Sequence, residues 1–161
     1  MKTYSGYITE LKSNQVFCFG SNLQGFHGAG AAGFASFGVN GNKWRDFDYS
    51  NKPNGWKGHW NIKGIGVGFQ EGNEGKSYAI PTVKRAGSPM SLDKSEICKN
   101  IQDLYSFAKD HPDLEFLIAY CNDGKTLLNG YTIEEMATMF NVATIPENIV
   151  FEERFAEIIK K

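Results

Sequence analysis

A short apolar strand that runs directly into a loop of small residues constrains the fold of this chain more than any other feature. Residues 16–37 read VFCFGSNLQGFHGAGAAGFASF. The VFCF run is typical of a buried strand that stops at Gly20-Ser21-Asn22, and we expect a helix over residues 29–37. Glycine and alanine leave main-chain N–H groups accessible, and a helix N-terminus carries partial positive charge. This strand–loop–helix unit therefore predicts a floor that binds phosphate or pyrophosphate.

The composition is that of one globular domain spanning residues 1–161. With 41% hydrophobic and 22% charged residues, the chain can bury a sizeable core. The formal charge of −1, with Lys and Arg spread along the chain, argues against a nucleic-acid partner. No apolar stretch approaches membrane-spanning length and the first residues lack a signal-peptide core, so we expect a cytoplasmic protein with no membrane partner.

The three cysteines are far apart in the sequence and show no CxxC spacing. Cys18, Cys98 and Cys121 therefore indicate free, buried or half-buried thiols rather than a disulfide framework or a zinc site. We expect no metal and no cofactor.

The hydrophobic pattern predicts strands that alternate with helices. Strands are expected at residues 3–9, 16–19, 77–80, 114–120 and 148–151, the third ended by Pro81. Helices are expected at 29–37, from Ser91 or Asp93 to His111, from the capping box at Thr132 to Phe140, and at 152–161. Residues 38–75 hold all three tryptophans without helical periodicity, which indicates a long irregular insertion with a hairpin near 60–69. The alternation predicts a three-layer α/β/α domain with a mixed, mostly parallel sheet.

Two glycine motifs match known phosphate-binding sequences only in part. Gly28 to Gly33 spells G-x-G-x-x-G, but the dinucleotide fingerprint requires its first glycine directly after the strand. Gly75-Lys76-Ser77 resembles the end of a P-loop, but Gln70 stands where that motif needs glycine. We reject the P-loop and do not favour the dinucleotide fingerprint, which stays an alternative. The small residues of the first also fit a helix packed closely on the sheet, with no ligand.

Polar residues that follow the expected strands are the candidates for chemistry. Asn22 suits a ribose hydroxyl or a water, although capping a turn is the commoner role of Asn. His27 is a candidate general acid or phosphate partner, or a solvated loop histidine. Because ligands of open α/β sheets lie beyond the carboxyl ends of strands, we expect the loop that contains Asp123 and Lys125 to face the first loop. Thr82 and Lys84 would form a third wall. The alternatives are an ordinary Asp-Gly turn and plain surface.

The motifs resemble those of the macro domain superfamily, whose members bind ADP-ribose. Residues 6–9 (GYIT) are similar to that family's opening GDIT, and Ser21-Asn22 falls near the last Asn of its NAAN motif. The combination of FGSN, HGAGAA and SYAIPT resembles uncharacterised macro-like proteins of bacteria and phages. Three features depart from the pattern: Tyr7 replaces the aspartate that binds adenine, the second loop reads CNDGKTLLNGY, and residues 38–75 are inserted.

The resemblance implies a domain that binds ADP-ribose or a related nucleotide diphosphate and hydrolyses ADP-ribosyl bonds. Catalysis is expected from Asn22, His27 and Asp123. Ligand binding is expected from Gly20, Ser21, Asn22, Gly28, Ala29, Gly30, Ala31, Thr82, Lys84, Asn122, Asp123, Gly124 and Lys125. Two alternatives stay open: a non-catalytic reader or sequestering protein for a nucleotide signal, and a protein-interaction module that uses the Trp-rich insertion.

Overall fold

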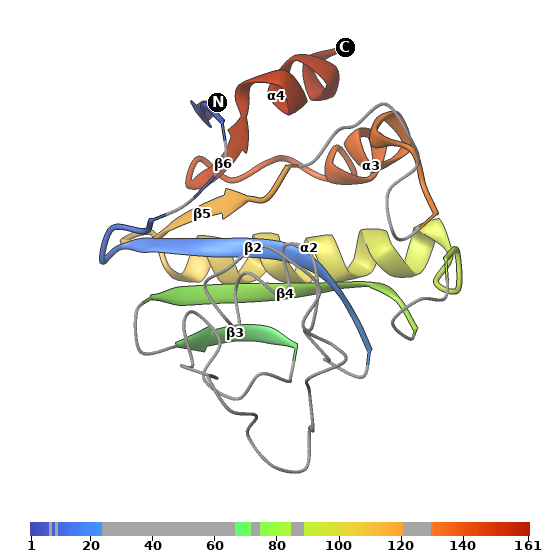
Figure 1. Ribbon diagram of the computed structural model, residues 1–161, viewed down its shortest axis with the longest axis horizontal. Coiled ribbons are helices and arrows are strands. Elements are labelled where there is room, and N and C mark those ends of the chain that lie inside the picture. The colour runs from blue at the N-terminus through green and yellow to red at the C-terminus, as the bar shows by residue number, and fades with distance from the viewer. Residues whose placement is uncertain (7, 9, 24–66, 72–74, 85–88, 121–129) are drawn as a thin grey trace.

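The computed structural model describes residues 1–6, 8, 10–23, 67–71, 75–84, 89–120 and 130–161 (Figure 1). Its strands are β1 Lys2–Tyr4, β2 Gln15–Asn22, β3 Gly68–Glu71, β4 Lys76–Val83, β5 Glu115–Ile118 and β6 Ile149–Glu152. Its helices are α2 Lys94–Asp110, α3 Ile133–Phe140 and α4 Glu153–Lys160. Within these ranges, no helix is both long and apolar enough to cross a membrane.

The six described strands form one sheet in the order β1-β6-β5-β2-β4-β3. Every neighbouring pair is parallel except β3 and β4, which are antiparallel. The apolar strand β2 lies inside the sheet and pairs with β4 on one side and β5 on the other. The predicted α/β class and the mixed, mostly parallel sheet are confirmed.

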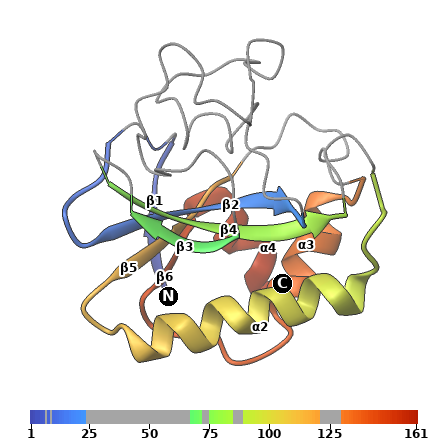
Figure 2. The same cartoon turned by 90° about the horizontal axis from the view of Figure 1, so that it is seen from below.

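The three described helices pack on one face of the sheet (Figure 2). Alternating side chains divide β2 between two cores, because successive residues of a strand point to opposite faces. Val16 and Cys18 join the helices in the larger cluster, whereas Phe17 and Phe19 form a second cluster with Ala79. The helix predicted at residues 29–37, which would supply the third layer, lies outside the described residues.

Capping boxes set the starts of two helices. Asp93, rather than Ser91, caps α2: its Oδ1 accepts the Glu96 N–H at 2.8 Å, and Glu96 Oε1 accepts the Asp93 N–H at 3.4 Å. Thr132 and Glu135 make the same reciprocal pair at the start of α3, with both distances 3.1 Å. Each box satisfies N–H groups that the first turn leaves without helical partners. These local signals explain why the predicted helix starts are confirmed.

Two predicted strand boundaries are wrong. The first strand ends at Tyr4, not Thr9, and the chain turns at Gly6 with φ +79°. Pro81 lies inside β4 instead of ending it, because the pairing with β3 stops at Ala79 and β2 is irregular opposite this point. Strand β3 lies in the insertion and overlaps the end of the hairpin predicted near residues 60–69, whose residues 60–66 lie outside the described residues. The other insertion residues, 38–66 and 72–74, lie outside the described residues.

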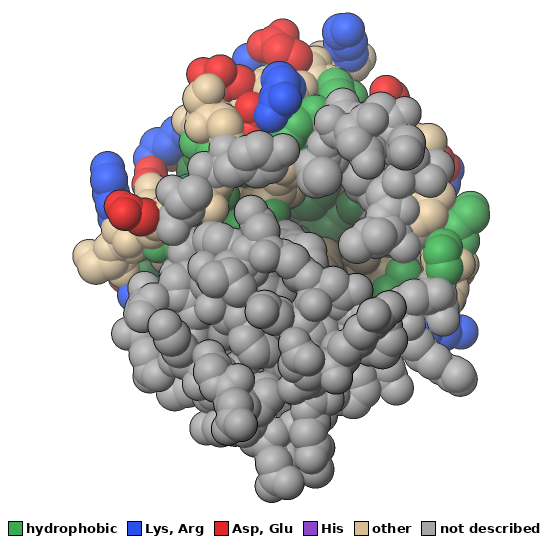
Figure 3. Space-filling model, viewed as in Figure 1, with side chains coloured by type: hydrophobic (Ala, Val, Ile, Leu, Met, Phe, Trp, Pro, Cys, Tyr) green, Lys and Arg blue, Asp and Glu red, His purple; other side chains and the backbone are tan. Residues whose placement is uncertain are grey.

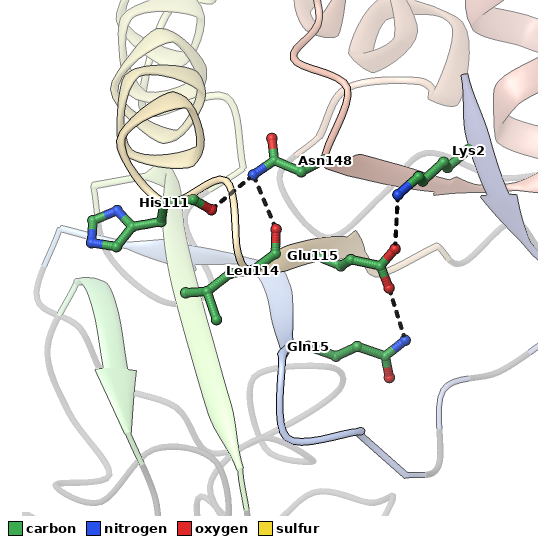
Figure 4. Close-up of polar contacts among 6 residues, drawn as sticks. All are labelled: Lys2, Gln15, His111, Leu114, Glu115 and Asn148. Carbon is green, nitrogen blue, oxygen red and sulfur yellow. Dashed lines mark hydrogen bonds and ion pairs between the residues drawn. The ribbon is translucent and has the colours of Figure 1, made fainter.

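Asn148 fastens the end of α2 to the start of β5 (Figure 4). Its Nδ2 lies 2.8 Å from the carbonyl oxygen of Ala108 and 3.0 Å from those of His111 and Leu114. Its own carbonyl accepts the Phe116 N–H at 2.8 Å. One amide side chain therefore links three carbonyls at this junction, two of which, those of Ala108 and His111, also accept main-chain N–H groups.

Replacing Asn148 tests this role. We expect Asn148→Ala to lower the free energy of unfolding by about 1–3 kcal/mol, because the half-buried amide that links the end of α2 to the start of β5 is lost with its hydrogen bonds. Asn141→Ala is the matched control, since its Nδ2 donates to one carbonyl, that of Ile159, at 2.8 Å. Urea unfolding measures both variants. Equal losses in the two would contradict the role given to Asn148.

Candidate functional site

The carboxyl ends of β2 and β5 form a topological switch point. The two strands are parallel neighbours. The chain that leaves β2 leads to β3 and β4 on one side of the sheet, whereas the chain that leaves β5 leads to α3 and β6 on the other. Open α/β sheets bind ligands outside the carboxyl ends of strands at such points. In Figure 1 this is the edge towards which the β2 and β4 arrows point.

Gly20 exposes main chain at this edge. The four preceding residues of β2, residues 16–19, are at most 4% exposed, but Gly20 is exposed. A Cβ built on Gly20 would lie 3.4 Å from Thr82 Oγ1 and 3.8 Å from Thr82 Cγ2, which is ordinary contact. Gly20 is also not among the glycines with positive φ. Among the described residues, neither packing nor backbone conformation requires glycine at this position, so a ligand has room to approach the main chain here.

The structure brings together three of the predicted binding residues. Thr82 Oγ1 donates to the Ser21 carbonyl oxygen at 3.3 Å, across the β2–β4 pair, and Gly20 adjoins both. Ser21 and Thr82 are 5% and 6% exposed. This hydrogen bond joins the ends of β2 and β4 next to Gly20.

Of the remaining predicted residues, Asn22 and Lys84 lie at this edge, and the others lie outside the described residues. Asn22 is the last residue of β2, and the Leu23 N–H donates to the Val83 carbonyl at 3.1 Å. Lys84 is exposed at the end of β4, where its main-chain N–H donates to Ser91 Oγ at 2.8 Å. Outside the described residues lie His27, Gly28, Ala29, Gly30, Ala31, Asn122, Asp123, Gly124 and Lys125.

A buried carboxylate at the same edge was missed from the sequence. Glu152 is 2% exposed and caps α4: its Oε2 accepts the Arg154 N–H at 2.8 Å, and its Oε1 accepts Arg154 Nε at 3.1 Å. Burial, the largest single influence, raises the pKa of Glu152. Hydrogen bonds from Arg154 and from the Gly6 N–H outweigh it and hold the pKa below its usual value. The sequence does contain a signal for this role, because an acidic residue directly before a helix is favoured as its N-cap.

Two aromatic side chains, Tyr4 and Tyr120, make further contacts between the ends of β1, β5 and β6. Tyr4 Oη donates to the Ile118 carbonyl at 2.6 Å. The Arg154 guanidinium lies 5.0 Å from the centre of the Tyr120 ring, the last described residue before the second predicted loop. Residues from four elements thus hold this part of the edge in place.

The described surface of this edge is partly apolar. Figure 3 shows charged side chains gathered where α4 and the N-terminus lie, and hydrophobic ones at the edge towards which β4 points. Leu23 and Met90, which follow β2 and β4, are 53% and 59% exposed. Apolar surface with a few polar groups is usual at small-molecule sites.

The described thiols are free, as predicted, and Cys18 lacks the features of a nucleophile. Cys18 is fully buried in β2, and burial raises its pKa well above the usual value. Cys98 is half-buried on α2, and burial raises its pKa as well. Cys121 lies outside the described residues.

Glu152 gives stability a specific dependence on pH. Because its pKa is lowered in the folded state, its contribution is present above the unfolded pKa of about 4.3 and is lost as pH falls through the folded pKa. We expect Glu152→Gln to flatten the fall in unfolding free energy between about pH 5 and pH 3. Glu157→Gln, on the exposed side of α4, should keep the wild-type slope. Parallel profiles for wild type and Glu152→Gln would refute this assignment.

No family model, curated protein or solved structure matches this chain. The resemblance to macro domains therefore rests on the sequence motifs alone.

Proposed function

We propose that the edge formed by the ends of β2, β4 and β5 binds ADP-ribose or a related nucleotide diphosphate. The observation that supports this most is Gly20, an exposed glycine in a buried central strand that neither its described neighbours nor its backbone conformation requires. Its position beside the switch point is where open α/β sheets bind ligands. The HGAGAA and SYAIPT motifs supply the choice of ligand class.

Main-chain donors suit this ligand better than a cluster of cations. The chain has a formal charge of −1, so bulk attraction cannot hold a doubly charged pyrophosphate. In the proposal, the N–H groups of Gly28, Ala29, Gly30 and Ala31 bind the pyrophosphate, and Lys84 adds one cation at the rim. The bare backbone of Gly20 lets the ribose–phosphate lie flat on the end of β2.

The second part of the proposal is hydrolysis of an ADP-ribosyl bond. Asn22 would orient a water or the distal ribose, and Asp123 or His27 would transfer the proton. The bond from the ribose anomeric carbon to its acceptor would break as the oxygen of water attacks that carbon. The acceptor leaves with a proton, and free ADP-ribose is the other product. Binding without turnover, as in a reader of a nucleotide signal, is the alternative that the next experiments separate.

Substituting Gly20 tests the binding site. We expect Gly20→Ala to weaken ADP-ribose binding about tenfold or more, or ~1.4 kcal/mol, because a methyl group then stands where the ligand contacts the backbone. The melting temperature should hold, since the new Cβ makes only ordinary contacts with Thr82. Titration calorimetry and thermal unfolding measure the two effects, with Gln102→Ala, exposed on α2, as the control. Unchanged affinity in a folded Gly20→Ala protein would remove the main support for this site.

Asn22→Ala distinguishes a hydrolase from a reader. For a hydrolase, we expect release of ADP-ribose from a modified peptide to fall by a factor on the order of 10² to 10⁴, with affinity much less changed. Wild-type protein that binds without any release is a reader. Wild-type protein that binds none of ADP-ribose, NAD and ADP would overturn the proposal and favour an interaction module.

A further inference from the structure

Met90 combines two unfavourable features at one residue. It is the one non-glycine residue with positive φ in the described part of the chain, at 55°. It is also an apolar side chain that is 59% exposed. Left-handed backbone favours Gly and Asn and costs other residues energy, so a methionine held there needs a compensating contact.

The compensating contact is with Gly130. A Cβ built on Gly130 would lie 2.6 Å from Met90 Cγ, 2.9 Å from Pro89 Cβ and 3.1 Å from Met90 N. The backbone of Gly130, with φ +88°, therefore lies directly against Met90. Only a glycine permits this approach, both in space and in conformation.

Neighbouring hydrogen bonds make this contact part of a larger joint. Tyr131 Oη donates to the Leu92 carbonyl at 2.6 Å, and both residues are at most 3% exposed. The Lys84 N–H bond to Ser91 Oγ ties the same segment to the end of β4. Figures 1 and 2 show the described end of the connection from β4 to α2 beside the start of α3, at the edge where β2 and β4 end. Met90 thus joins the chain that follows β4 to the chain that follows β5.

We propose that Met90 is a redox-sensitive contact that controls affinity at this edge. The inference rests on the proposed nucleotide site. A peroxide transfers one oxygen atom to Met90 Sδ: the sulfur lone pair attacks, the O–O bond breaks, and the peroxide is reduced to water or an alcohol. The thioether becomes a sulfoxide, a bulkier polar group one bond away from the Cγ that lies against Gly130, and this change destabilises the contact. The segments that follow β4 and β5 then lose their shared contact, and affinity falls.

The distribution of methionines makes the reaction selective. The chain has four, of which Met1 and Met90 are 57% and 59% exposed, whereas Met136 and Met139 are 6% and 2% exposed. Peroxide should therefore oxidise Met1 and Met90 first, because susceptibility follows exposure. Met1→Leu leaves Met90 as the exposed target, and Met90→Leu, a swap that conserves volume, leaves Met1.

The two variants form the test. Each is treated with hydrogen peroxide, mapped by peptide mass spectrometry and titrated with ADP-ribose. We expect oxidised Met1→Leu to bind about fivefold more weakly or worse, with a lower melting temperature and faster hydrogen exchange at Gly130 and Tyr131. Treated Met90→Leu should match its untreated form. Methionine sulfoxide reductase should restore the Met1→Leu protein.

The outcomes separate the two proposals. Full sulfoxide at Met90 with unchanged affinity, or an equal loss in treated Met90→Leu, overturns the redox inference. Untreated protein that binds no nucleotide overturns the proposed function. In that case the melting temperature and hydrogen exchange still test the joint, and their insensitivity to oxidation would show that Met90 does not join the two segments.

Discussion

The double pairing of β2 is the constraint on which the rest of the structure depends. Its apolar run hydrogen-bonds to β4 along one side and to β5 along the other, and the Ala119 N–H extends the second ladder to the Cys18 carbonyl at 2.8 Å. A strand buried on both faces and paired on both sides has no freedom to shift, because a one-residue slip would turn Val16 and Cys18 away from the helices. This pairing places the ends of three strands around Gly20.

Polar side chains fix the two edges of the sheet at single points. Asn148 joins helix and strand at the amino edge, and Glu152 joins β6, α4 and the turn at Gly6 at the carboxyl edge. Each is half-buried or buried and satisfies several main-chain groups, so its loss leaves partners that water reaches poorly. The edge with the candidate site is thereby held at Glu152, at Thr82 and at the contact between Met90 and Gly130.

Local signals made the three described helices and most described strands predictable, whereas features that depend on distant partners were not predictable. The capping boxes at Asp93 and Thr132 lie within four residues of sequence, so they could be read directly. The sequence predicts a strand end at Pro81, but a proline is tolerated inside β4 because β3 stops pairing before it. The exposure of Gly20 and the burial of Glu152 likewise follow from the sheet order. For the candidate site, the sequence could place Gly20, Ser21 and Thr82 at strand ends, but not show that they adjoin.

The most direct test of the account is an amide NMR titration of the isotope-labelled protein with ADP-ribose. Chemical shifts should change at Gly20, at Thr82 to Lys84 and at Ala119 to Tyr120, with little change at the Asn148 edge. Such a pattern would place the ligand on the switch point between β2 and β5. Saturable changes confined to the Asn148 edge, or no changes at millimolar ligand, would contradict a ligand site at the end of β2.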